Sequence, residues 1–424
     1  MKSLLDKLFF RSNNLNNISQ SFKKLSSKSP VSKIFKAINT YSSSSEIRYV
    51  GGCVRKIINK EEIDDIDLAT NLEPKKICDA LKKNQINFHE TGIDHGTITA
   101  LIDNYKFEIT SLREDTSTDG RHAQVRYSDD WKKDAIRRDF TINCIYSDYD
   151  GNLFDPYNGK KDIEEGEINF IGNSDERIKE DYLRILRYVR FFINYSKQKH
   201  KIDTIKSIRR NLDGISKLSK ERLIDELKKI LKPNILQKLV NDKFCLEILE
   251  IIFPELKYFN VFSRLNSYAT KILNEVEFIF LISLLIIDET DNTDYFLYKF
   301  NVSKKDKKRI KDLEDFYKKE KITKKLSEKN LNRVFYYKGK DAVIDILNFK
   351  IFKSKKSDKD LIELVYLYKN KLIPTMPVKA DTLMEKYKIP QGKLLGDKLK
   401  LIEEEWVNNN FQISDQQIEI IANR

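Results

Sequence analysis

The sequence is poor in residues that break regular structure and in residues that bind transition metals. Its 424 residues include only 13 glycines, 8 prolines, 4 cysteines and 4 histidines. Low glycine and proline, together with 40% hydrophobic residues, exclude a disordered or low-complexity chain. The cysteines form no CxxC pair and the histidines no HExxH motif, so neither a disulfide framework nor a zinc site is expected. A reducing, cytoplasmic compartment is the simpler expectation.

Long apolar runs are also missing. The most apolar segment, Phe278–Ile287, is much shorter than the ~20 residues that span a bilayer, and it predicts a buried helix. Residues 1–30 form an N-terminal extension rich in Ser, Asn and Lys, with Asp6 as its only acid. An ordinary amphipathic extension is favoured there over an organellar transit peptide, which the composition loosely resembles.

Positive charge is in excess. Lysine and arginine total 78 against 65 acidic residues, which gives a formal net charge of +13. A balance of this size suits a polyanionic partner such as RNA or a nucleotide. Lys, Ile and Asn are abundant throughout, as AT-rich coding would produce, so the charge alone decides little.

The pattern along the chain predicts an α+β fold. Short β-like runs alternate with turns before about residue 160, and helical stretches follow Gly52 and cover Pro74–Lys83. The expected strands are Ile47–Val50, Ile66–Leu68, Thr97–Ile102, Lys106–Thr110 and Phe140–Ser147. After about residue 175 nearly every segment has apolar residues at three- and four-residue spacing, which predicts helices. A mixed domain followed by all-α domains is therefore expected.

A glycine turn and two neighbouring acids stand out in the first part. The segment Gly51–Arg55 leads from an apolar strand through Gly51 and Gly52 into a predicted helix, where a phosphate can approach the backbone and Arg55. By itself such a turn is more often only a turn. Asp65 and Asp67 come next, on one face of a predicted strand. Two carboxylates at this spacing repel each other unless a cation such as Mg²⁺ lies between them.

Further candidates follow at longer range. Glu108 is predicted on a strand, where it either takes a proton from an attacking hydroxyl or completes the metal site; an outward-facing strand acid is the alternative. The remaining candidates for phosphate and ribose contacts are Arg137, Arg138, Asp139 and Asn143. Between these two groups, Leu112–Trp131 is predicted to be a mobile loop near the site.

A helix with regularly spaced charges is predicted over Ile178–Phe191. Asp181, Arg184 and Arg187 follow at three-residue intervals on one side, with Arg190 near them. A salt-bridged helix surface explains this spacing equally well. A functional interpretation is that a carboxylate beside a guanidinium matches the pairing edges of cytosine and adenine, which present an amino donor beside a ring-nitrogen acceptor. Uracil and guanine present the reverse polarity and would leave groups unpaired.

The motifs in order resemble one family. Its five motifs match Gly51–Arg55, Asp65–Thr70, Arg137–Thr141, Asp155–Asp162 and Glu180–Arg187. This set resembles the class II CCA-adding tRNA nucleotidyltransferases, including their bacterial poly(A) polymerase relatives. Residues 392–406 are similar to the tail of alphaproteobacterial-type members. Two positions depart from the family pattern, since Lys56 replaces the usual Asp and Cys144 the usual Ala.

The resemblance implies an architecture and a set of roles. It implies a polymerase-β-like head at 31–165 and helical neck, body and tail domains at 166–232, 233–370 and 371–424. It implies that Asp65 and Asp67 bind Mg²⁺. Gly52, Arg55 and Arg137 would bind the phosphates and sugar of the nucleotide, and Asp181, Arg184, Arg187 and Arg190 would form its pocket, the first two reading the base.

The implied activity is addition of CMP and AMP, from CTP and ATP, to the 3′ end of tRNA. A poly(A) polymerase is the alternative; those relatives typically carry an arginine-rich strand before the third carboxylate, whereas Gly96–Leu101 contains no arginine. CC-only and A-only specialists also remain open, although CC-only members look loop-deficient and this chain keeps Leu112–Trp131. An inactive RNA-binding module is disfavoured by the three acidic positions.

Overall fold

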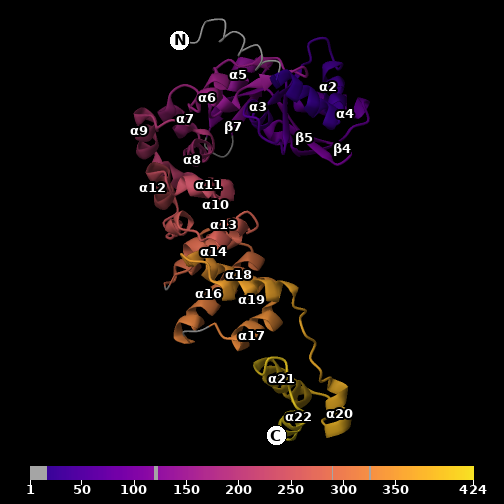
Figure 1. Ribbon diagram of the computed structural model, residues 1–424. Helices are drawn as coiled ribbons and strands as arrows, with labels where there is room; N and C mark the ends of the chain where they lie inside the picture. Colours follow the sequence, from indigo (N-terminus) through magenta and orange to yellow (C-terminus); the bar gives the residue numbers. More distant parts are fainter. Residues whose placement is uncertain (1–16, 119–122, 289, 324–325) are drawn as a thin grey trace. The chain divides into compact units, whose positions relative to one another are not determined.

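The chain folds into two compact units, one mixed and one helical (Figure 1). The computed structural model describes residues 17–118, 123–288, 290–323 and 326–424. The units are Met1–Glu226 and Leu227–Arg424. β-strands occur in the first unit, and the described part of the second contains helices as its only regular structure. The α+β fold expected from the sequence is confirmed. Within the described residues, no helix is long and apolar enough to cross a membrane.

A seven-stranded sheet forms the base of the first unit, with strand order β3-β4-β5-β2-β1-β8-β9. The strands are β1 (Ile47–Val50), β2 (Ile66–Thr70), β3 (Asn87–Gly92), β4 (Thr97–Ile102), β5 (Tyr105–Ser111), β8 (Tyr146–Ser147) and β9 (Leu153–Phe154). Central β2 pairs in parallel with β5 and antiparallel with β1. Ile66 and Leu68 are buried, whereas Asp67 between them is half-buried. Side-chain alternation along the strand therefore turns Asp67 away from the core.

Helices accompany this sheet. They are α2 (Val31–Asn39), α3 (Gly52–Ile58), α4 (Pro74–Lys83), α5 (Trp131–Ile136) and α6 (Gly159–Glu165). α3 contacts β1, β2 and α6, and α2 contacts β1 and α4. Pro74 occupies the first turn of α4, where its fixed φ suits a helix and its missing N–H costs nothing. Both helical stretches expected before residue 160 are confirmed, and the packing places the start of α3 beside β2.

The strand expected over Phe140–Ser147 is wrong for most of its length. Residues 141–143 form a 3₁₀ turn, η2 (Thr141–Asn143), and only Tyr146–Ser147 enters the sheet. Side-chain bonding explains the difference: Asp139 accepts from the Phe140 N–H at 2.9 Å and from Asn143 Nδ2 at 2.9 Å. These local bonds compete with the strand ladder and favour a turn.

The segment Leu112–Trp131 contains a hairpin, which corrects its interpretation as a loop. β6 (Arg113–Thr118) and β7 (Ala123–Tyr127) pair antiparallel as a separate two-stranded sheet. The segment connecting the two strands lies outside the described residues. β6 contains only polar residues and therefore lacks the apolar alternation that marks a strand, whereas β7 alternates Ala123, Val125 and Tyr127 with polar residues over only five positions.

Four helices and a 3₁₀ turn follow the sheet. They are α7 (Ser174–Glu180), α8 (Leu183–Tyr195), α9 (Ile202–Arg210), η3 (Leu212–Lys217) and α10 (Lys220–Ile230). The single helix expected over Ile178–Phe191 is wrong, because α7 and α8 are separated at Asp181. Asp181 has extended backbone angles, φ −153° and ψ 104°, and its carboxylate accepts from the Leu183 N–H at 3.1 Å. An Asp that bonds the first free N–H of a helix favours a new start over continuation.

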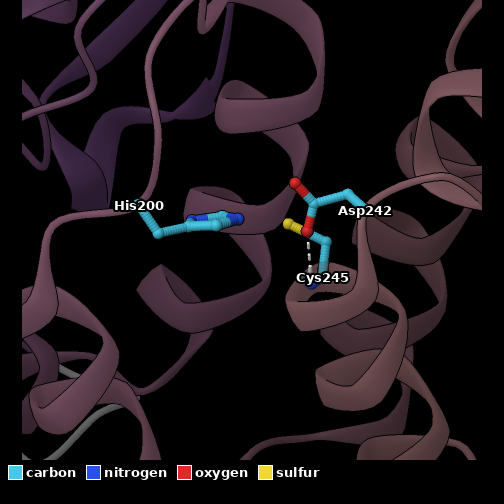
Figure 2. A group of neighbouring side chains, drawn as sticks. All are labelled: His200, Asp242 and Cys245. Carbon is cyan, nitrogen blue, oxygen red and sulfur yellow. Dashed lines mark hydrogen bonds between the residues drawn. The ribbon is translucent and has the colours of Figure 1, made fainter.

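Helices make up the regular structure described in the second unit. They are α11 (Pro233–Leu239), α12 (Lys243–Ile252), α13 (Ser267–Ile272), α14 (Phe278–Ile286), α15 (Asn292–Lys299), α16 (Lys304–Thr323), α17 (Glu328–Lys338), α18 (Lys340–Lys353), α19 (Lys359–Asn370), α20 (Ala380–Tyr387), α21 (Lys393–Asn408) and α22 (Asp415–Asn423), with a 3₁₀ turn η4 (Phe259–Ser263). Asp242 caps α12 by accepting from the Cys245 N–H at 2.8 Å (Figure 2). The predicted buried helix over Phe278–Ile287 is confirmed as α14. The last three helices share a separate apolar core that includes Leu383, Ile402 and Ile418.

Candidate functional site

A cavity of about 390 Å³ lies in the first unit and collects most of the residues predicted from the sequence. Its lining residues are Gly51, Gly52, Arg55, Asp67, Arg138, Asp139, Asn143, Asp181, Arg184, Arg187, Arg190 and Phe191. Five arginines face three aspartates, so the lining suits a ligand with several negative charges. These residues come from the β1–α3 turn, α3, β2, the segment after α5, and α8 together with Asp181, two residues before it.

The glycine turn lets the backbone come close to two charged side chains. Gly51 has φ +66°, a conformation that L side chains rarely adopt. A Cβ on Gly51 would lie 3.6 Å from Arg138 Nη1, and one on Gly52 would lie 3.6 Å from Asp67 Oδ2. The turn therefore leaves open space between the backbone, a guanidinium and a carboxylate, as a bound phosphate requires.

Arg55 projects from α3 into the same cavity. Its residue is only 7% exposed, and its guanidinium donates to Asn143 Oδ1. Among the described residues, none accepts a hydrogen bond from its buried Nε. A buried donor that lacks an acceptor is costly, and a ligand oxygen would remove that cost. Arg55 thus offers an anion both charge and an unused N–H group.

Three carboxylates gather where β2 and β5 run side by side. Asp67 and Glu108 are directly opposite each other in the parallel register, and Asp65 lies just before β2. Burial, followed by the charges of Glu108 and Asp65, raises the pKa of Asp67 from 3.8 to about 6; Arg138 and Arg55 act in the opposite direction. Asp65 and Glu108 are exposed. Hard carboxylate oxygens under mutual repulsion fit a divalent cation, which would favour the ionised form of Asp67.

This raised pKa gives a prediction about stability. Between its ordinary pKa of 3.8 and about 6, Asp67 binds protons more tightly in the folded state, so its ionisation destabilises the fold as the pH rises through this window and above it. Without divalent cations at pH 7.5, Asp67→Asn should therefore raise the free energy of unfolding by about 1–3 kcal/mol. Urea denaturation in EDTA measures this.

Two controls accompany that measurement: the same comparison at low pH, and the substitution of a neighbouring acid. At pH 3.5 the gain should shrink, because Asp67 is then largely protonated in both states. Asp64→Asn removes an exposed acid that pairs with Lys56 at 2.6 Å and should not raise stability. An Asp67→Asn protein less stable than wild type at pH 7.5 would contradict the electrostatic account.

Asp139 and Asn143 form a hydrogen-bonded connection between α3 and α8. Asn143 Oδ1 accepts from Arg55 and its Nδ2 donates to Asp139 at 2.9 Å. Asp139 Oδ2 accepts from Arg187 Nε at 2.6 Å. Burial by itself would raise the pKa of Asp139, but Arg187 and the hydrogen bond from Asn143 lower it to about 2. The Asp139 carboxylate thus orients Arg187 in this structure.

Asp181 and Arg184 both line the cavity, but they do not form a side-chain pair with each other. Asp181 Oδ2 accepts from Arg222 Nη2 in α10 at 2.8 Å. Arg184 Nη1 donates to Glu180 Oε2 at 2.7 Å, and its Nη2 donates to the carbonyl oxygen of Arg137 at 3.0 Å. Asp181 is thus held by a tertiary partner, and Arg184 by Glu180 four residues earlier and by the distant Arg137 carbonyl, so the two side chains are positioned separately.

Arg137 occupies a different position from its neighbour. Arg138 lines the cavity, whereas the Arg137 side chain lies outside the lining and pairs with Asp134 Oδ1 at 2.8 Å. Asp65 and Glu108 also lie outside the lining but act electrostatically on Asp67. Three predicted residues therefore border the cavity region without lining it.

Phe191 and Asp134 are site residues that sequence reasoning missed. Phe191 is 2% exposed, and the guanidinium carbons of Arg190, Arg55 and Arg187 lie 4.2, 4.9 and 5.5 Å from its ring centroid. One aromatic ring therefore packs against three of the five cavity arginines. Its signal was an aromatic residue four positions after Arg187. For Asp134, the signal was an acid three and four positions before an arginine pair.

Comparison with known proteins identifies related sequences over both units. Residues 47–169 match the model of the Poly A polymerase head domain, and residues 201–260 match that of the probable RNA and SrmB-binding site of polymerase A. The chain is 42% identical over 206 residues to the mitochondrial CCA tRNA nucleotidyltransferase 1 of Homo sapiens, covering 48% of each chain. It is 30% identical over 308 residues to the CCA-adding enzyme of Staphylococcus haemolyticus, covering 71% of this chain and 72% of that one.

The alignment spans about half the length of the first of these relatives, the human protein. Solved structures extend the likeness in fold. A Bacillus stearothermophilus CCA-adding enzyme in complex with CTP matches 92% of this chain and 95% of its own, with a TM-score of 0.69 and 20% identity. A Thermotoga maritima CCA-adding enzyme complexed with tRNA matches 92% and 94%, with a TM-score of 0.59 and 18% identity. At these identities the structures establish a shared fold.

Proposed function

The chain belongs to the family of CCA-adding enzymes, and we propose on that premise that it adds CMP and AMP, from CTP and ATP, to the 3′ end of tRNA without a nucleic-acid template. One observation carries the proposal: a single cavity combines the glycine turn, Asp67 and five arginines. A triphosphate needs several cationic donors, and a carboxylate beside them allows a cation to bind at the phosphates. Names of relatives that refer to CCA, CTP and tRNA support the same substrates.

The reaction joins the 3′ hydroxyl oxygen of the RNA to the α-phosphorus of the nucleotide. The bond between the α-phosphorus and the oxygen bridging to the β-phosphorus breaks, and pyrophosphate leaves. Arg55 and Arg138 would bind and orient the phosphates at the glycine turn. Glu108, exposed opposite Asp67, either accepts the hydroxyl proton or helps to hold the cation.

We propose Mg²⁺ as the cation, with Asp65 and Asp67 as its protein ligands. When bound, it supplies positive charge that stabilises the developing charge on the phosphate oxygens. The half-buried Asp67 and exposed Asp65 leave the carboxylates open to solvent on one side, which suits an ion that keeps several waters. Arg187 and Arg190, oriented by Asp139 and Glu226, complete the nucleotide pocket in this proposal.

Base selection is assigned to Asp181 and Arg184. Each side chain is held by a partner outside the cavity. The acceptor and donor sites that are left for the base therefore have fixed positions before the nucleotide binds. A carboxylate acceptor beside a guanidinium donor accepts the pairing edges of C and A and opposes those of U and G.

The proposal extends to the remaining domains. We propose a head at 31–165, a neck at 166–232, a body at 233–370 and a tail at 371–424, with residues 1–30 as an extension. A cytoplasmic location is also proposed. The match of residues 47–169 to the Poly A polymerase head domain supports the C-terminal boundary of the head.

The test is the length and composition of the product. Purified protein is incubated with tRNA that lacks its 3′ CCA, with Mg²⁺ and with each labelled nucleotide alone or in combination. Extension by three residues from CTP and ATP together, and none from UTP or GTP, is expected. Long A tracts on any RNA would identify a poly(A) polymerase, products ending in CC or extended only from CC would identify a specialist, and no extension would refute transferase activity.

A further inference from the structure

The two arginines Arg137 and Arg138 share one buried carboxylate. Asp134, in α5, has a side chain that is only 1% exposed. Its Oδ1 accepts from Arg137 Nε at 2.9 Å, and its Oδ2 accepts from Arg138 Nε at 3.2 Å and Nη2 at 3.1 Å. The Tyr146 hydroxyl, from β8, donates to the same Oδ2 at 2.7 Å. Both carboxylate oxygens are thus committed to fixed donors.

These bonds determine where the Arg138 guanidinium can lie. Its Nη1 points to Gly51, 3.6 Å from the position of an added Cβ, and donates to the Asn143 carbonyl oxygen at 3.5 Å, while its other two nitrogens donate to Asp134. Because a guanidinium is planar and its donors form a rigid fork, bonds on one edge fix the direction of the remaining donors. Arg138 therefore presents Nη1 to the glycine turn.

Arg138 also lies close enough to Asp67 for its charge to act on that carboxylate. A guanidinium without a fixed counter-ion would gain most by pairing with a partly buried carboxylate, and Asp67 is one. An Arg138–Asp67 ion pair would occupy the carboxylate that a cation needs. It would also turn the Arg138 guanidinium away from the position where it can bind a phosphate. The competition between Asp134 and Asp67 for Arg138 thus affects both proposed ligands.

We propose that Asp134, supported by Tyr146, is a positioning residue that fixes Arg138 over the glycine turn and prevents it from pairing with Asp67. The inference rests on the proposed function of the cavity and adds a role for a residue that does not line it. Asp134 touches neither nucleotide nor cation. It acts by keeping a phosphate-binding donor and a cation-binding carboxylate apart before either ligand arrives.

A merely structural role makes a different prediction. Removing a buried carboxylate that pairs with two arginines lowers stability in either case. Only the positioning role predicts that a folded Asp134→Asn protein also binds CTP and divalent cations more weakly. The substitution retains the shape of the side chain but removes its charge, so Arg138 loses its fixed counter-ion.

Binding is measured at equilibrium without tRNA, so no turnover is needed. We expect the dissociation constant of Asp134→Asn to rise about ten- to a hundredfold for CTP, as for the loss of a charged hydrogen bond. The affinity for Mn²⁺ alone, followed by electron paramagnetic resonance, should also fall. Asp345→Asn is the matched control, because Asp345 is a 7% exposed aspartate that Arg309 binds with two nitrogens in the second unit. It should bind CTP with wild-type affinity.

A double-mutant cycle tests the route through Arg138. If Asp134 acts by positioning Arg138, then Asp134→Asn should weaken CTP binding much less in an Arg138→Met background than in wild type. If Asp134→Asn and Arg138→Met weaken CTP binding independently, so that their effects add, Asp134 does not act through Arg138. Tyr146→Phe retains the Asp134 charge but removes both the 2.7 Å bond to Asp134 and the 3.2 Å bond that the hydroxyl accepts from Arg138 Nε. It should weaken CTP and Mn²⁺ binding a few-fold, and it provides the test if Asp134→Asn does not fold.

The two levels of inference fail separately. If wild type does not extend tRNA, the proposed function is wrong. If wild type extends tRNA and a folded Asp134→Asn protein binds CTP and Mn²⁺ with wild-type affinities, the positioning role is wrong and the proposed function stands.

Discussion

Asp67→Asn is expected to lower the rate of nucleotide transfer by about a thousandfold or more, the scale of losing a principal electrostatic contribution to catalysis. The substitution replaces a carboxylate oxygen, which binds a divalent cation strongly, with a neutral amide of the same shape. Asp67 is the only one of the three clustered acids that also lines the cavity, so no other member of the cluster substitutes for it there. Single-turnover extension of tRNA ending before CCA, measured at saturating Mg²⁺ and CTP, gives the rate.

The structure makes this loss distinguishable from unfolding. The same substitution should stabilise the cation-free protein, because it removes a carboxylate whose ionisation opposes folding at neutral pH. An inactive protein of raised stability would be typical of a residue retained for function. Asp64→Asn, three residues away and paired with Lys56, should retain wild-type rates. Turnover by Asp67→Asn within tenfold of wild type would exclude Asp67 as the principal cation ligand.

Asp181→Ala is expected to lose discrimination among nucleotides as well as activity. Its carboxylate, as an acceptor, would bond the amino group of C or A, and it would face a carbonyl of U or G with no proton between them. Removing it loses a charged hydrogen bond, so incorporation of CMP and AMP should fall about ten- to a hundredfold. Misincorporation of UMP or GMP should rise relative to them. Relative incorporation of all four nucleotides, in competition, measures the effect.

The salt bridge of Asp181 with Arg222 allows a structural role to be separated from base selection. If Asp181 served only to tie α10 to the start of α8, its loss would lower stability and leave the nucleotide ratio unchanged. Asp175→Ala removes another acid that pairs with a distant arginine, Arg210, outside the cavity. That protein should keep wild-type selectivity. An unchanged ratio in Asp181→Ala would show that Asp181 does not read the base.

Part of the site followed from local pattern. The strand carrying Asp67 was recognisable because buried Ile66 and Leu68 alternate with it, and the turn at Gly51 because a strand and a helix signal meet at two glycines. Such patterns involve residues a few positions apart, whose geometry is set by the strand or helix itself. Side-chain chemistry then indicated phosphate and cation ligands before any partner was known.

Local sequence pattern did not predict the contacts that orient the cavity residues. Arg55 meets Asn143 across 88 positions, and Asp181 meets Arg222 across 41. The predicted Asp181–Arg184 pair assumed one continuous helix, whereas Asp181 is the C-cap of α7 and its carboxylate accepts from the Leu183 N–H at the start of α8. Asp134 was not predicted as a site residue. Its partners Arg137 and Arg138 follow it by three and four positions, but this spacing does not show that the carboxylate is buried.

By itself, the sequence determined the α+β class, the helical second half, and the residue types that a phosphate and a cation require, because these depend on short-range periodicity and on chemistry. Only the tertiary structure decided which charged groups are already committed to one another. Arg138 is held by Asp134 while Asp67 remains under repulsion, and this difference arises from burial and from strands that meet in space. Electrostatic energies depend on the distance between charges and on their exposure to solvent. Neither quantity can be read from the local sequence pattern.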